Sequence, residues 1–114
     1  MRIAGLVLPL AACTVVLCSF ACGDALHQDE LDCEEAVSHL EACCPGFVAS
    51  SNLRCIYDDP GCGTVTEPAI PEDAAGCIRN KSCDTVVQDG VCAAIASAQA
   101  KLGPNGVLPS GVCQ

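Results

Sequence analysis

Residues 33–47 read CEEAVSHLEACCPGF and contain the strongest helix signal in this 114-residue chain. Apolar residues and cysteines recur in it at steps of three and four, the period of a helix with one buried face. Asp32 precedes the stretch as a candidate N-cap, and Glu35, three residues later, completes a capping box. Pro45-Gly46 ends the pattern and turns the chain. We therefore predict a helix that begins at Asp32 and ends before Pro45.

Three more helices are predicted after this one, from capping and propensity signals. Pro71 and the two acids after it suit a first helical turn, and Ser82 can cap a short helix that ends at Gly90. An alanine-rich segment then has high helix propensity until Gly103-Pro104 stops it. The expected ranges are about 71–80, 82–90 and 92–102.

The remaining segments are expected to be irregular. Residues 47–70 contain two turn clusters, SSN at 50–52 and DDPG at 58–61. The tail 105–114 also has no periodic pattern, and Cys113 is its candidate anchor. The predicted fold class is a small, disulfide-rich, mainly α domain of about four short helices with one long irregular loop over 47–70.

The composition shows why such a domain needs cross-links. The chain is 51% hydrophobic, but residues 1–22 hold 17 of the apolar side chains. Of the 41 apolar residues that follow, twelve are alanine and nine are cysteine, which leaves 20 larger ones among 92 residues. That fraction is close to the boundary at which packing alone no longer holds a chain together. We expect covalent links to supply much of the stability.

The cysteines after residue 22 are the expected source of these links. They are Cys33, Cys43, Cys44, Cys55, Cys62, Cys77, Cys83, Cys92 and Cys113. No C-x2-C pair occurs among them, so the common zinc and thioredoxin spacings are absent. Each disulfide would contribute about 2–4 kcal/mol to stability. The pairing stays open, because even eight cysteines allow 105 combinations.

Adjacent Cys43 and Cys44 carry one constraint on the pairing. On a helix their side chains point about 100° apart. We therefore expect them to bond to different segments, and the cysteines of the first helix to bond to later helices rather than to one another.

The N-terminus has the layout of a secretory signal peptide. Arg2 is followed by twenty uncharged, mostly apolar residues, and acids become frequent from Asp24 onward. A membrane-spanning anchor is the alternative, since twenty residues can just cross a bilayer. Pro9, the small residues near the exit and the lack of a following basic cluster favour cleavage. The expected organisation is a signal peptide over 1–21, an acidic leader or tether over 22–32 and a cross-linked helical domain over 33–114.

Cys22 is the candidate lipidation site. Residues 19–22, SFAC, resemble the lipobox of bacterial lipoproteins, with Ser19 and Phe20 departing from the usual residues. The match at Cys13 is better residue by residue, but cleavage there leaves a very short signal and an apolar mature end. The alternative is that Cys22 forms a disulfide. The number of cysteines favours this alternative, because the nine after Cys22 leave one thiol unpaired, whereas ten including Cys22 can all pair.

No catalytic set is recognisable in the sequence. His39 shares a helical face with Glu35 and Cys43, a pattern compatible with a metal pair or a Cys–His dyad. The competing interpretation is a surface histidine beside a disulfide cysteine, which export favours. The pairs of adjacent acidic residues fall at helix starts and turns, and they lack the spacing of oxygen ligands that a calcium-binding loop requires. We expect no enzyme activity, no cofactor and no metal site.

The charge of the mature chain restricts its partners. Cleavage removes Arg2 and leaves 14 acids against four bases, a net charge of −10. That charge opposes nucleic acid and anionic lipid alike, so we expect membrane attachment through a lipid only. An unidentified protein is the remaining kind of partner.

The C-x9-CCPG element at residues 33–46, with the cysteines from 55 to 92, resembles small cysteine-rich exported proteins of myxobacteria, many of which look like lipoproteins. The resemblance implies an extracytoplasmic location and no specific activity. The expected function is a non-enzymatic, lipid-anchored envelope or surface protein, in the periplasm, outer membrane or cell surface. The alternative is a freely secreted, extracellular effector, such as a hydrolase inhibitor or small toxin, that uses the loop 47–70 as its contact surface.

Overall fold

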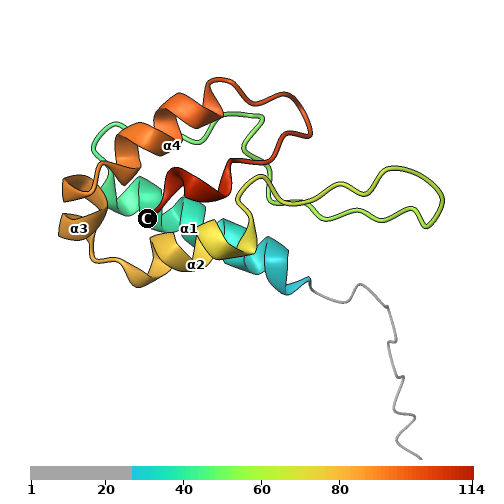
Figure 1. The fold of residues 1–114 in the computed structure, drawn as a ribbon, viewed down its shortest axis with the longest axis horizontal. Coiled ribbons are helices and arrows are strands. Elements are labelled where there is room, and N and C mark those ends of the chain that lie inside the picture. Colours follow the sequence, from blue (N-terminus) through green and yellow to red (C-terminus); the bar gives the residue numbers. More distant parts are fainter. Residues whose placement is uncertain (1–26) are drawn as a thin grey trace, which may run out of the picture.

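The structure, a computed structural model, describes residues 27–114 as four α-helices and one 3-10 turn (Figure 1). The elements are α1 (Gln28–Cys43), α2 (Glu72–Asn80), α3 (Cys83–Gln88), α4 (Val91–Gln99) and η1 (Ser110–Val112). Within these residues there is no strand, only an isolated antiparallel bridge between Asp58 and Thr66. The predicted fold class, mainly α with four helices and a long irregular loop, is confirmed. The signal peptide 1–21, Cys13, Cys22 and the first part of the leader lie outside the described residues.

The start of α1 differs from the sequence prediction. The helix begins at Gln28, with His27 in extended conformation before it, so the prediction of Asp32 as N-cap is wrong. Asp32 is instead buried within the helix, where Gln28 Nε2 donates to its carboxylate at 2.8 Å. Arg79 of α2 is 3.1 Å from the same carboxylate oxygen. The last part of the predicted leader, residues 28–32, is therefore helical.

The other three helices match their predictions closely. Pro71 is the N-cap residue of α2, and Ser82 caps α3 by accepting the Thr85 N–H at 3.2 Å. Gly90, predicted as the end of α3, separates it from α4 in left-handed conformation with φ of 73°. An L-residue with a side chain rarely adopts that conformation, so glycine suits this junction.

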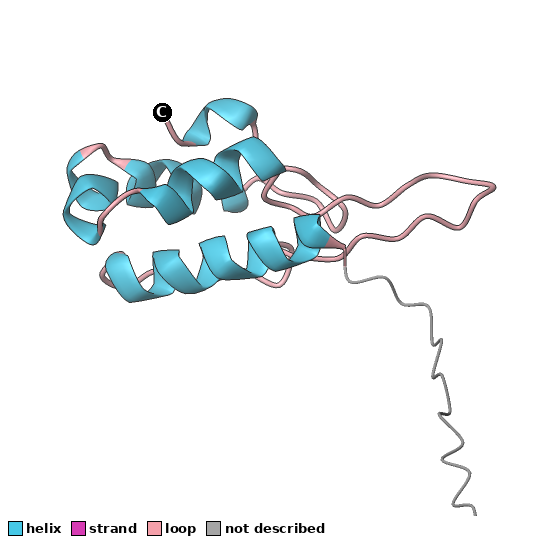
Figure 2. Ribbon diagram, turned by 90° about the horizontal axis from the view of Figure 1, so that it is seen from below, coloured by secondary structure: helices cyan, strands magenta, loops and turns pink. Residues whose placement is uncertain are grey.

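The helices pack in two layers around one core. Figure 2 shows the long helix α1 as one layer and the shorter helices as the other. Leu40 of α1, Ile78 of α2, Val86 of α3 and Ile95 of α4 are all fully buried in the same cluster. Each of the four α-helices thus contributes at least one large apolar side chain, which keeps the core small and continuous.

An irregular arm projects from this helical body. We define the arm as residues 56–66; it is the long loop extending from the helices in Figure 1. Its two sides meet in the Asp58–Thr66 bridge, with N–H···O distances of 2.9 and 2.8 Å. At its base the Tyr57 N–H donates to Glu30 Oε1 at 2.6 Å, and the rings of Tyr57 and His27 lie 4.1 Å apart. The arm base therefore lies against the first turn of α1.

Four disulfides link these elements. They are Cys33–Cys55, Cys43–Cys83, Cys44–Cys92 and Cys77–Cys113. The tail is pinned through Cys113, as predicted from the sequence. Cys62, at an exposed position in the arm, has no disulfide partner within residues 27–114.

Candidate functional site

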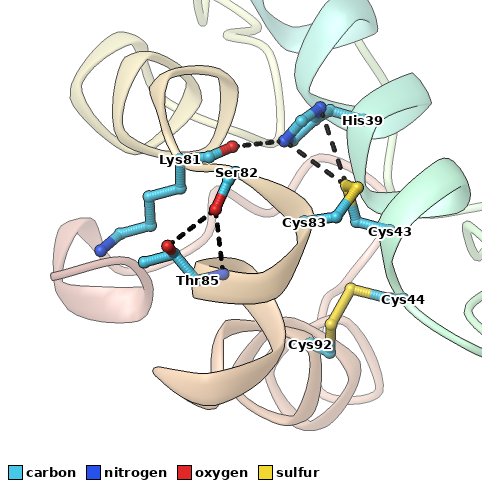
Figure 3. Close-up of a disulfide and its surroundings, with 8 residues drawn as sticks. All are labelled: His39, Cys43, Cys44, Lys81, Ser82, Cys83, Thr85 and Cys92. Atoms are coloured by element: carbon cyan, nitrogen blue, oxygen red, sulfur yellow. Dashed lines mark hydrogen bonds between the residues drawn. A yellow bond between two sulfur atoms is a disulfide. The ribbon is translucent and has the colours of Figure 1, made fainter.

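The end of α1 carries two disulfides from adjacent residues, which we call the disulfide hub: Cys43–Cys83 and Cys44–Cys92 (Figure 3). Cys43 is the last residue of α1, whereas Cys44 has φ of −98° and ψ of 110° and lies outside the helix. This change of backbone conformation directs the two cysteines to different helices. Cys43 bonds to the first residue of α3 and Cys44 to the second residue of α4.

The prediction of different partners for Cys43 and Cys44 is thus confirmed. For Cys33, the other cysteine of α1, the expectation of a later helix is wrong, because it bonds to Cys55 in the loop. Cys33 is fully buried in the part of α1 that faces the arm base. A loop cysteine near that base is therefore its neighbour, and the third and fourth helices contain none that reaches it.

His39 lies beside the first disulfide of the hub. Its Nε2 is 2.8 Å from the carbonyl oxygen of Lys81, which only accepts hydrogen bonds, so Nε2 carries a proton and donates it. Nδ1 and Nε2 are 3.9 and 3.6 Å from Cys43 Sγ. Figure 3 shows the imidazole between the Lys81 backbone and the sulfur. His39 therefore joins α1 to the residue that precedes the α3 cap.

This geometry decides between the interpretations of His39. Cys43 is oxidised, so a dyad with a free thiol is wrong. Glu35, on the same helical face, accepts a hydrogen bond from Arg79 at 2.6 Å. Within the described part of the chain no three His, Cys, Asp or Glu residues gather as metal ligands. The histidine beside a disulfide cysteine is the arrangement observed.

The hub disulfide Cys43–Cys83 is asymmetric in its exposure. Cys43 is buried, with 8% of its surface exposed, whereas Cys83 is exposed to solvent. None of the other three disulfides in residues 27–114 has an exposed cysteine. The α3 side of this disulfide therefore lies at the protein surface, and the histidine lies on its α1 side.

A network of ion pairs joins Arg79 of α2 to two acidic residues of α1. Arg79 Nη1 lies 2.6 Å from Glu35 and 3.1 Å from the buried Asp32. The hydrogen bond to Glu35, together with the negative charges of Asp32 and Glu35, raises the pKa of Arg79 above its ordinary value, although desolvation opposes this. The guanidinium is therefore charged at every physiological pH.

Sequence reasoning missed the partners that surround the predicted residues. Arg79 and the Lys81 carbonyl come from α2 and its C-terminus, far along the chain from His39 and Asp32. A backbone carbonyl has no sequence signature, and a single arginine has many candidate acids. The helical periodicity did place Glu35, His39 and Cys43 on one face, but it did not reveal what covers that face.

One hollow in the described surface is an open groove of about 390 Å³ along α4. It is lined by alanines, Leu102, Val107 and Pro109, with Ser97 and Lys101 as its polar members. A single lysine and a serine supply neither an oriented base nor a carboxylate pair. No helix among residues 27–114 is long and apolar enough to cross a bilayer.

No protein-family model, curated protein or solved structure matches this chain. The resemblance of the C-x9-CCPG element to myxobacterial exported proteins therefore stays a prediction. What the structure does show is a cysteine-rich domain with four disulfides. Disulfides at this density are typical of oxidising compartments, and they indicate an extracellular or exported protein.

Proposed function

We propose that the protein is a non-enzymatic exported module, held at the bacterial envelope or cell surface by a lipid on Cys22. The observation that supports export most directly is the set of four disulfides, which forms and persists in an oxidising compartment. The signal-peptide pattern of residues 1–21 agrees with it. The described chain also offers no assembled catalytic group, which favours a structural or binding role.

The disulfide pairing bears on the role of Cys22. Eight cysteines of the domain pair among themselves, so none of the four links needs a tenth cysteine. Cys22 is thus spare with respect to the core, as a lipidated cysteine must be. The competing arrangement is a fifth disulfide between Cys22 and Cys62, whose thiol is exposed.

The length of chain between Cys22 and His27 bears on which end of the domain a lipid would hold. Cys22 is five residues before His27, a reach of at most about 17 Å in extended chain. His27 lies at the start of α1 beside the arm base, and the disulfide hub lies at the other end of this helix, about 24 Å away. A lipid on Cys22 would hold the arm-base end near the membrane and leave the hub directed away from it.

Intact mass and thiol counting of the exported protein test lipidation together. We expect a mass gain of about three acyl chains, recovery in the membrane fraction and one maleimide-reactive thiol, that of Cys62. The variant Cys22→Ser should move to the soluble fraction, whereas the control Cys13→Ser should stay at the membrane. An unmodified mass with no reactive thiol would instead establish the Cys22–Cys62 disulfide and overturn the lipid anchor.

The arm supports a second candidate, a freely secreted effector such as a hydrolase inhibitor or small toxin. The arm projects from the body (Figure 1), and residues 58–65 are all exposed. Its base is held by the Cys33–Cys55 disulfide and the Glu30–Tyr57 hydrogen bond, so a contact surface there is presented from a fixed base.

Replacement of residues 58–61 by Gly-Ser-Gly-Ser tests this second candidate. Partner capture from the secreted fraction should be abolished while the four disulfides stay intact. A matched control is Ala93→Ser, an exposed change on α4 that should leave capture unchanged. Unchanged capture by the arm variant would contradict the effector hypothesis.

A further inference from the structure

We infer that the Cys43–Cys83 disulfide is a thiol-exchange site, at which an external thiolate attacks Cys83 and the protonated His39 ring stabilises the departing Cys43 thiolate. This function goes beyond the proposed role of an exported envelope module. The reacting partner is identified by its chemistry, a low-mass thiol or an exported dithiol protein.

Exposure determines which sulfur is attacked. An attacking thiolate must approach one sulfur of a disulfide, and access decides which one. Cys83 is exposed, while the seven other paired cysteines of residues 27–114 are buried or half-buried. Cys43 is closed off by the end of α1 and by the His39 ring (Figure 3). Attack at Cys83 is thus the open route, and Cys43 is the leaving group.

The surroundings of Cys43 favour its departure. A thiolate released into a buried position is disfavoured unless a proton or a positive charge meets it. Both ring nitrogens of His39 lie close to Cys43 Sγ, at 3.9 and 3.6 Å, so the sulfur lies against the ring and a protonated imidazole places its positive charge there. The charged side chains near the ring are already paired, Glu35 with Arg79 and Lys81 with Asp89. His39 is therefore the group positioned to stabilise a thiolate at this sulfur.

The reaction balances with a thiol as the only co-reactant. The thiolate forms a bond to Cys83 Sγ while the Cys43–Cys83 bond breaks, and its electron pair leaves with Cys43. The proton given up by the attacking thiol ends on Cys43, which becomes a thiol, and His39 is unchanged overall. With a dithiol partner, its second thiolate attacks its own sulfur in the mixed disulfide and releases Cys83. The partner is then oxidised by two electrons and the protein disulfide is reduced.

The second disulfide of the hub keeps the opening local. Cys44–Cys92 still joins the end of α1 to α4, immediately after α3 in the chain. Val86 also holds α3 in the core by a fully buried side chain. Reduction of Cys43–Cys83 therefore frees the N-terminus of α3 without unfolding the domain, as a reversible exchange site requires.

Limited reduction with glutathione tests the inference on the oxidised protein as isolated, after its free thiols have been blocked with N-ethylmaleimide. The reaction is quenched with iodoacetamide, and the adducts are mapped by peptide mass spectrometry. We expect Cys43–Cys83 to open first, with glutathione on Cys83 and carbamidomethyl on Cys43. If adducts first appear on another disulfide, or if glutathione is found on Cys43, the proposal is overturned. This experiment uses the wild-type protein, so its outcome does not depend on whether a variant folds.

The variant His39→Gln tests the role of the imidazole. Glutamine retains an N–H donor for the Lys81 carbonyl but carries no positive charge, so exchange at Cys83 should slow about tenfold. The reduction rate of Cys44–Cys92 should stay unchanged. The matched control is Glu35→Gln, one turn earlier on the same face, which should exchange at the wild-type rate. An unchanged rate in His39→Gln, or equal slowing in Glu35→Gln, would overturn the role of His39.

Discussion

The helical body and the arm differ in how each is held. In the described chain every buried hydrophobic residue lies in the helices or in the segments that pack on them, and none lies in residues 56–66. Ile56 and Val65, the aliphatic residues of the arm, are 42% and 41% exposed. The arm is held by one backbone bridge and by polar contacts at its base. Burial therefore stabilises the body, while the arm depends on the body for its position.

Cysteine shows the same difference between the two regions. The paired cysteines lie in the helices or in the segments next to them, and the one in the arm, Cys62, has no partner among residues 27–114. A disulfide needs two Cα atoms about 4.4–6.8 Å apart, which packed elements provide and a projecting loop does not. Packing thus determines which cysteines are used as cross-links.

Removal of the longest-range disulfide should damage the body most. The double variant Cys44→Ala with Cys92→Ala opens a link between residues 48 positions apart. We expect the free energy of unfolding to fall by about 4 kcal/mol. About 3 kcal/mol of this is loop-closure entropy, because Cys43–Cys83 remains and only the short segment from 83 to 92 is set free. The remainder is the lost packing of the buried Cys44 sulfur. Urea unfolding followed by circular dichroism measures the change. A loss below about 1 kcal/mol would show that the hub does not constrain the unfolded state.

Leu40→Ala should have the next largest effect. Leu40 is fully buried in the core between α1 and the other helices, so its truncation leaves a cavity and should cost about 3 kcal/mol in free energy of unfolding. The matched arm variant Val65→Ala should change it by less than about 0.5 kcal/mol. Equal losses in thermal or urea unfolding would contradict the division into a packed body and an unpacked arm.

Glu30→Ala tests the joint between the two regions. The Tyr57 N–H loses its carboxylate acceptor, and we expect a loss of about 1 kcal/mol, felt mainly at the arm base. Hydrogen exchange should speed up at the Tyr57 amide and stay unchanged in α2. Asp29→Ala, an exposed neighbour on α1, is the control. Undisturbed protection of Tyr57 would show that the base is held by other contacts.

Cys62→Ser should have the smallest effect on stability. The side chain is exposed and unpaired in the described chain, so the free energy of unfolding should change by less than about 0.5 kcal/mol. Urea unfolding beside the wild-type protein measures it. A loss above about 1 kcal/mol would mean that Cys62 takes part in a contact outside residues 27–114, such as a disulfide to Cys22.

Much of the secondary structure was predictable because its signals are local. Ser82 caps α3, Pro71 precedes α2, and Pro45-Gly46 follows α1, each through short-range backbone chemistry. Asp32 shows where this reasoning fails. Its spacing to Glu35 fits a capping box, but Arg79 of another helix binds both acids and buries Asp32 in mid-helix. A local pattern does not reveal such a partner.

The sequence by itself determined the general organisation of the chain: an apolar start, an acidic cysteine-rich remainder, and helices bounded by caps, glycines and prolines. Composition, charge and short-range periodicity carry these properties, so they can be read before folding. Only the tertiary structure decided the four pairings, the exposure of Cys83 and the contact of His39 with Cys43. These depend on which distant segments meet, and helix packing around a shared core brings them together.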